Sequence, residues 1–157
     1  MDANIGITQK NLEGVNKELI VVLSNTVLLY MKARKFHWNV GGNSFMELHK
    51  LFERHYEKLD ESMDEIAERI SKLGFIVPGT LSEFVKTGTL EEAPGINPDQ
   101  QGMIRELLQD HEAVIIGLRK SVDACEENFK DKGTSDFLTG LMQDHETLAW
   151  TLRRYLK

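Results

Sequence analysis

The sequence predicts an all-α protein, a four-helix bundle with a short helix in one long connection. Four long segments repeat apolar residues every three or four positions, which is the period of an amphipathic helix. The chain contains only three prolines, and all three lie between the second and third segments or at the start of the third. A length of 157 residues suits one domain with a substantial core, so residues 1–157 are expected to form a single unit.

The first helix is expected from about Thr8 to His37, where the apolar spacing continues over many turns. The pair Gly41-Gly42 ends it, because glycine permits a tight turn. Ser44 and Glu47 then match the Ser-x-x-Glu capping box, in which each side chain satisfies a free backbone donor. This motif predicts the start of a second helix, which runs to about Leu73.

The connection after the second helix covers roughly residues 75–97 and is rich in proline and glycine. Within it, residues 80–86 are predicted to form a short helix, capped by Thr80 with Glu83 three positions on. Asn97-Pro98 marks the predicted start of the third helix, with proline at the first helical position. This third helix is expected to reach about Phe129.

Lys132-Gly133 is predicted to break the chain before a fourth helix, which Thr134 or Ser135 caps and which runs to the end of the sequence. The segment Gln109–Glu112 (QDHE) recurs as Gln143–Glu146 on the third and fourth predicted helices. Two hairpins with short loops, joined by one long crossover, predict a ferritin-like four-helix bundle with a short helix in the B–C crossover.

The net charge of the chain is −6, and its isoelectric point is near 5.4. This balance argues against a general affinity for nucleic acid or anionic membranes, because both reward clustered Lys and Arg. It is compatible with a protein that handles cations.

A cytoplasmic location is expected from three features of the sequence. Cys125 is the one cysteine, so the chain has no intrachain disulfide, and a reducing compartment fits. The first ten residues lack the apolar core of a signal peptide. The most apolar stretch, Leu19–Met31, contains three consecutive polar residues and is too short to span a bilayer, so it is predicted to be a core helix.

Five side chains are candidate metal ligands. His37 closes the first predicted helix, whereas His49 and Glu53 stand four positions apart on the second, as do Asp64 and Glu68. Residues four apart share one helix face, and imidazole with carboxylate suits iron or zinc. An isolated pair of this kind more often belongs to an ordinary solvated helix face than to a metal site. His37 and His49, however, lie at similar heights on either side of one helical turn, so His37, His49 and Glu53 can converge.

The acidic pair Asp64 and Glu68 cannot join this cluster within one chain. The midpoints of the two pairs are residues 51 and 66, a separation of 15 residues, or roughly 22 Å of helix. Fifteen residues return to within roughly 60° of the same face. Two antiparallel copies of the helix about a two-fold axis would therefore form two identical shared sites on an isologous interface. The chain contains no Glu-x-x-His motif, which argues against the intrasubunit di-iron site of other bundles.

Several runs of residues together resemble the signature of the Dps family, the mini-ferritins named for protecting DNA in starved cells. Around the candidate ligands they are Lys35–Gly42 (KFHWNVGG), Phe45, Leu48-His49, Phe52, Asp64-Glu65 and Ala67–Ile70 (AERI). The likeness continues through Leu81–Phe84, Glu91–Pro94, His145-Glu146 and Trp150–Arg153. It covers nearly the whole chain and so implies one ferritin-like (Dps) domain over residues 1–157.

The resemblance implies a hollow shell of twelve subunits that oxidises Fe(II), usually with hydrogen peroxide, and stores the ferric product, protecting the cell against oxidative damage. It implies that His37, Asp64 and Glu68 are the main iron ligands and that His49 is the second histidine. The fifth ligand is usually Asp in the family, whereas this chain has Glu53, whose extra methylene can shift the second iron.

The resemblance also implies acidic pores at three-fold axes, near the turn between the third and fourth helices. Asp136 matches a pore aspartate, and Glu127 and Asp131 are further pore candidates; the alternative is that all three are ordinary helix-end charges. Trp38 adjoins His37 and is expected to pack at the subunit interface, and the family suggests a second role as an oxidisable group.

The three other histidines match no family ligand. His111 and His145 are expected to be structural or surface residues, and His55 is expected to be solvated.

Two other functions compete with the iron-oxidising shell. A nucleoid protein that coats DNA would be favoured by a Lys-rich tail, but the first ten residues hold one Lys and one Asp, so DNA binding is expected to be weak or absent. A shell that only sequesters metal is disfavoured by the complete ligand set. The partners implied are therefore eleven further copies of the chain, Fe(II) and an oxidant, which is peroxide or dioxygen.

Overall fold

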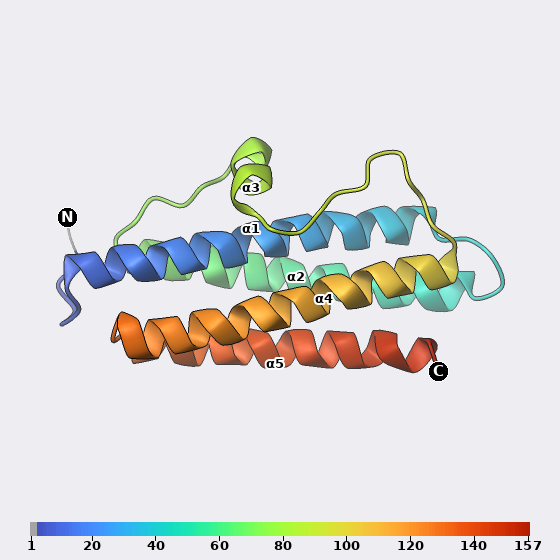
Figure 1. The fold of residues 1–157 in the computed structure, drawn as a ribbon. Helices are drawn as coiled ribbons and strands as arrows, with labels where there is room; N and C mark the ends of the chain where they lie inside the picture. The colour runs from blue at the N-terminus through green and yellow to red at the C-terminus, as the bar shows by residue number, and fades with distance from the viewer. Residues whose placement is uncertain (1–2) are drawn as a thin grey trace.

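The computed structural model describes residues 3–157, and within them it contains helices and no strands. Two long hairpins pack side by side, and the crossover between them carries a short helix that lies over α1 (Figure 1). The elements in chain order are α1 (Gln9–Asn39), α2 (Phe45–Lys72), α3 (Leu81–Thr87), α4 (Gln100–Asp123), the π-helical turn η1 (Ala124–Asn128) and α5 (Lys132–Tyr155). The predicted all-α, ferritin-like bundle with a crossover helix is confirmed.

The core of the bundle is a continuous apolar cluster drawn from α1, α2, α4 and α5. Its largest fully buried side chains include Phe36 on α1, Phe52 on α2 and Leu107 on α4. Burial of such residues is the main favourable term in folding, because it removes apolar surface from water. Within residues 3–157, no helix is both long and apolar enough to cross a membrane.

The helix boundaries confirm some of the predicted caps and correct others. Thr8 caps α1 by accepting from the Asn11 amide, and Thr80 with Glu83 forms the predicted capping box of α3. The predicted box of α2 is wrong: within the described residues the Ser44 side chain makes no cap bond, and Glu47 instead accepts from Tyr155 Oη at 2.8 Å.

The start of α4 lies two residues beyond the predicted one. Asp99 caps the helix by accepting from the Gly102 amide at 2.7 Å, so Pro98 precedes the cap instead of occupying the first helical position. An ionised carboxylate is a strong acceptor for amides at a helix start, and this accounts for the shift.

The turn between α4 and α5 is also tighter than predicted. The α4 path ends in the π-helical turn η1, and Lys130 then adopts a left-handed conformation with φ of 57°. Asp131 caps α5 by accepting from the Thr134 amide at 3.0 Å, so Lys132 and Gly133 are helical and the predicted caps Thr134 and Ser135 are wrong.

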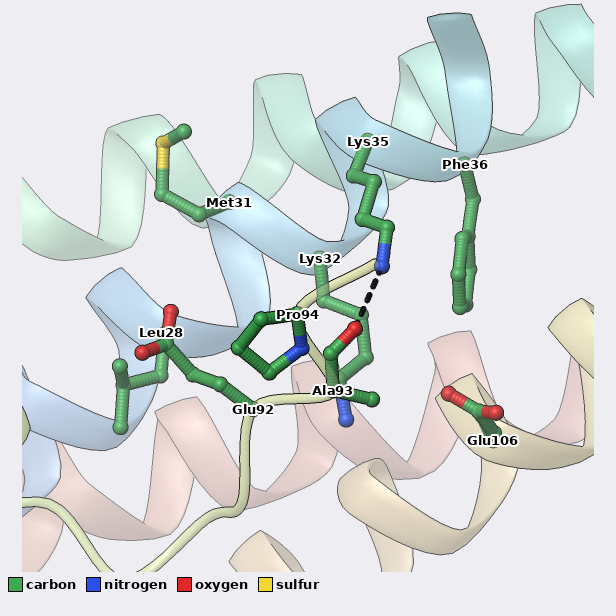
Figure 2. A pocket seen from close by; sticks show the side chains of 9 residues that line it. All are labelled: Leu28, Met31, Lys32, Lys35, Phe36, Glu92, Ala93, Pro94 and Glu106. Atoms are coloured by element: carbon green, nitrogen blue, oxygen red, sulfur yellow. Dashed lines mark hydrogen bonds between the residues drawn. The ribbon is translucent and has the colours of Figure 1, made fainter. Parts of the chain in front are cut away.

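The crossover is held against α1 by lysines that bind backbone carbonyls. Lys35 Nζ donates to the carbonyls of Ala93 and Ile96 at 2.9 and 2.6 Å, and Lys32 Nζ donates to that of Glu91 at 3.1 Å. Figure 2 shows Lys35 aimed at the Ala93 carbonyl beside a cavity of about 250 Å³. These bonds satisfy carbonyls of a segment that has no regular structure of its own.

All three histidines outside the predicted metal site are buried in the bundle. His55 on α2, His111 on α4 and His145 on α5 are 1%, 0% and 3% exposed. The expectation that His55 is solvated is therefore wrong. Leu51, Phe52 and Leu59 stand three or four positions from His55, and this helical spacing would have placed it on the inward face of α2.

Candidate metal centre

The turn between α1 and α2 brings His37 and His49 together. His37 Nδ1 donates to the His49 carbonyl at 2.8 Å, and His49 Nδ1 donates to the His37 carbonyl at 2.9 Å. The two rings stack with their centroids 3.7 Å apart. Because each Nδ1 carries the proton, the Nε2 of each neutral ring keeps its lone pair, which is the form that binds a metal ion.

The local sequence explains this reciprocal arrangement. The last turn of α1 and the first turns of α2 are joined by a short loop, in which Gly42 has φ of +105°. That conformation is costly for residues with a Cβ, so glycine keeps the hairpin tight. The tight hairpin sets His37 and His49 opposite each other.

Glu53 lies one helical turn beyond His49 and is held by a lysine. Lys50 Nζ is 2.6 Å from Glu53 Oε2. This hydrogen bond, with the charges of Lys50, His37 and His49, lowers the pKa of the Glu53 carboxyl. Glu53 is therefore ionised at neutral pH.

Asp64 and Glu68 lie further along α2 and are both exposed. Lys72 Nζ donates to Glu68 Oε2 at 2.9 Å, and this bond with the lysine charge lowers the pKa of Glu68. Within residues 3–157, no three His, Cys, Asp or Glu side chains come close enough together to hold a metal ion. Within one chain, Glu53 therefore does not complete a three-ligand cluster with His37 and His49, and the acidic pair lies apart from the histidine pair.

Asp64 lines a hollow whose wall is mostly apolar and also includes Asp60 and Glu61. It has a volume of about 640 Å³ and lies between α1, α2 and the crossover segment from Val77 to Phe84. On the same crossover, Ile76 is 94% exposed and Leu81 is 70% exposed. Exposed apolar surface beside a concave face is typical of a region that a protein partner covers.

An aromatic cluster adjoins His37, and it was not predicted from the sequence. Arg34 lies 4.5 Å from the Tyr56 ring centroid and 5.5 Å from that of Trp38, and its Nη1 donates to Tyr30 Oη at 2.7 Å. The Tyr56 ring meets the His37 ring at a nearly perpendicular angle, with 5.2 Å between centroids. The four-residue spacing of Tyr30, Arg34 and Trp38 along α1 was the signal available for finding it.

The three pore candidates differ in their surroundings. Asp136, which lies one turn beyond the start of α5, and Glu127 in η1 are exposed. Asp131 is 3% exposed, caps α5 and lies 3.3 Å from an Arg69 nitrogen. A buried carboxylate with these partners holds the α4–α5 turn together, so Asp131 is the least accessible of the three pore candidates.

Comparisons with known proteins identify the family to which this fold belongs. A ferritin-like domain model matches residues 16–157. The chain is 46% identical to an uncharacterized low temperature-induced protein of Nostoc sp., over 98% of this chain and 86% of the relative. It is 34% identical to DNA protection during starvation protein 2 of Bacillus anthracis, over 90% of this chain and 99% of the relative.

A solved structure resembles the whole fold. The Dps protein of Vibrio cholerae, described as a member of a broad superfamily of ferritin-like diiron-carboxylate proteins, has a TM-score of 0.92 and 28% identity, covering 99% of this chain and 97% of its own. The match extends through both hairpins and the crossover. This chain therefore belongs to the Dps family of ferritin-like proteins.

Proposed function

We propose that this protein is a ferroxidase and iron-storage mini-ferritin, which oxidises Fe(II) with hydrogen peroxide and stores the ferric mineral inside a hollow dodecamer. Membership of the Dps family supports a role in iron storage and DNA protection in general. The observation that carries the proposal is the His37–His49 pair, whose mutual carbonyl bonds leave both Nε2 atoms as metal donors.

The proposed site takes its other ligands from a second copy of the chain. Asp64 and Glu68 are too far along α2 to reach the histidines of their own chain, at roughly 22 Å of helix length. A two-fold axis beside α2 would place them against the partner's histidine pair. The mostly apolar hollow that Asp64 lines and the exposed Leu81 support a partner on this face.

The ligand set suits Fe(II) oxidation. Neutral imidazoles and ionised carboxylates bind Fe(II), and the carboxylates stabilise the higher charge of Fe(III) more strongly. Two Fe(II) ions each give up one electron, and one peroxide molecule accepts both electrons with two protons and leaves as two water molecules. Glu53 is proposed as the ligand that completes the second iron position.

DNA binding is proposed to be weak or absent. Twelve chains at −6 each would carry −72 formally, and such a shell repels phosphate at long range. A gel-shift experiment at low salt separates this proposal from a DNA-coating function, because a DNA-coating protein would retard the DNA under that condition.

The proposed function is tested by adding Fe(II) and peroxide to the purified iron-free protein. The ferric absorbance should rise rapidly while the particle mass stays that of a dodecamer plus its mineral. The iron-free particle should weigh about 215 kDa, or 12 × 17.9 kDa. A stable monomer or a 24-mer would contradict the proposed assembly, and slow oxidation by an intact dodecamer would contradict the ferroxidase.

Asp136→Asn should slow iron uptake roughly threefold to tenfold at low salt, because an acidic pore concentrates cations. The effect should shrink as salt rises, since exposed charges are screened. The measurement is the initial rate of mineral formation at several ionic strengths. Glu92→Gln removes the same charge from the exposed crossover and is the control. Equal uptake by Asp136→Asn and Glu92→Gln at low salt would show that Asp136 does not line the iron path.

A further inference from the structure

Three buried histidines form a row across the bundle, apart from the proposed metal centre. His55 Nδ1 lies 3.3 Å from His111 Nε2, and His111 Nδ1 lies 2.9 Å from His145 Nδ1. The row joins α2, α4 and α5. Each copy of the repeated QDHE segment supplies its histidine to the row.

The arrangement is that of a hydrogen-bond chain and not of a metal site. His111 faces His55 with Nε2 and His145 with Nδ1, on opposite sides of its ring. The nitrogens therefore do not converge on one point, as metal binding requires. His55 and His111 instead can each donate to one neighbour and accept from the other, and His145 at the end of the row bonds to His111.

The direction of the chain follows from the hydroxyl at its end. Thr151 Oγ1 donates its single proton to the Leu148 carbonyl at 2.7 Å, so it accepts from His55 Nε2 at 3.3 Å. A neutral His55 then has a bare Nδ1, which accepts from His111 Nε2. His111 in turn has a bare Nδ1, which accepts from His145 Nδ1. One set of tautomers satisfies the whole row.

Carboxylates that flank the row in sequence are already paired with cations. Asp110 and Glu112, beside His111, lie next to Lys32 of α1 and Arg153 of α5. The two acidic residues that flank His145 are paired in the same way: Asp144 lies next to Lys58 of α2, and Glu146 lies next to Arg119 of α4.

Charges near the row act on its rings as well. His145 and then Arg54 of α2 oppose a positive charge at His55, whereas Asp144 favours one at His145. His145 and His55 both oppose a positive charge at His111. Desolvation is the largest effect on all three rings.

We propose that His111 and His145 form an acid-sensitive lock between α4 and α5, closed while the two rings share one proton and open once both rings are protonated. A proton on His145 Nε2 leaves the chain intact, because His145 Nδ1 still donates to His111. A proton on His111 has only Nδ1 as its site, since Nε2 already carries one. Two N–H groups would then face each other at 2.9 Å between two buried cations.

Burial keeps the lock closed near neutral pH. It lowers the pKa of His145 to about 4 and that of His111 well below its ordinary value. In the unfolded chain both groups titrate near pH 6.5, so the unfolded state binds more protons below that pH. The stability of the fold must then decrease as the pH falls from about 6.5 towards 4.

The tautomers provide the first test, on the unaltered iron-free protein. The chain has five histidines, so solid-state ¹⁵N spectra of histidine-labelled protein are simple to assign with single variants. At pH 7.5 we expect His145 to carry its proton on Nδ1 and His111 on Nε2. A His145 protonated on Nε2 alone would break the chain and overturn the proposal.

Acid opening provides the second test. The double variant His111→Leu, His145→Leu fills the same region with apolar side chains that do not titrate. Hydrogen exchange, corrected for its intrinsic pH dependence, should show protection in α4 and α5 falling between pH 6 and 4 in the wild type and staying constant in the variant. The slope of the unfolding free energy against pH, at fixed protein concentration, reports how many more protons the unfolded state binds. That number should be smaller in the variant by up to two per chain.

Thr151→Val is the matched control, because it disturbs the same row without removing a titrating group. Its stability should change by the same amount at every pH, and its slope should equal that of the wild type. If the double leucine variant keeps the wild-type slope, the lock is wrong. If that variant does not fold, the tautomers of the wild type still decide the matter.

Discussion

Asp64→Asn combined with Glu68→Gln is expected to remove fast Fe(II) oxidation, with a loss of roughly a hundredfold or more. Both carboxylates are exposed in the single chain, so their neutral amides cost little packing. The amides keep the shape of the acids but lose the negative charge that holds a divalent ion. The measurement is the initial rate of ferric absorbance after Fe(II) and peroxide are mixed with the iron-free protein.

The control for this variant is Glu61→Gln with Glu65→Gln. These are also acidic residues four positions apart and exposed on α2, so the control removes the same charge from the same helix. It should oxidise iron at nearly the wild-type rate. Helical content by circular dichroism should match the wild type in both variants. An Asp64, Glu68 variant as fast as its control would remove these residues from the proposed site.

Subunit mixing is expected to restore activity that neither parent variant has. One variant lacks the histidines (His37→Ala, His49→Ala), and the other lacks the acids (Asp64→Ala, Glu68→Ala). Each alone should oxidise iron poorly. In a mixed dimer one site lacks both sets of ligands, whereas the other combines the intact histidines of one subunit with the intact acids of its partner.

Activity after co-assembly should therefore recover to at most half of the wild-type number of sites. A site built within one chain predicts no recovery, because every chain lacks part of it. The roughly 22 Å between the two pairs along α2 is the reason to expect the shared arrangement. Mixed dimers must be verified by mass, with distinguishable tags on the two variants. Verified mixed dimers without activity would rule out the shared site.

The helical bundle was predictable because its signals are local. Apolar residues recur at helical spacing through all four long segments, and the prolines cluster around the crossover. The helix starts were less predictable, because several side chains near each start can act as the cap. At α5 the sequence offers Asp131, Thr134 and Ser135, and the carboxylate of Asp131 is the one that caps the helix.

The histidine pair was also accessible to sequence reasoning. His37 and His49 flank one short turn, so a helical hairpin places them at the same height whatever the rest of the chain does. Their reciprocal bonds to each other's carbonyls depend on the rotation of both helices, which the spacing alone does not set. The contact of Tyr56 with His37 also depends on the rotation of the two helices, so spacing alone does not predict it.

The sequence by itself determined the elements that depend on neighbours a few residues away: the helices, the crossover, the candidate ligands and the long separation along α2. Only the tertiary structure decided which polar residues are buried, because burial depends on which helix faces pack together. From the sequence alone, the repeated QDHE segment could equally belong to a solvated surface. In the structure, α4 and α5 pack against each other along it. The packing of these helices places His111 against His145. Burial of inward faces likewise leaves Asp131 only 3% exposed, where its partners compensate for the lost water.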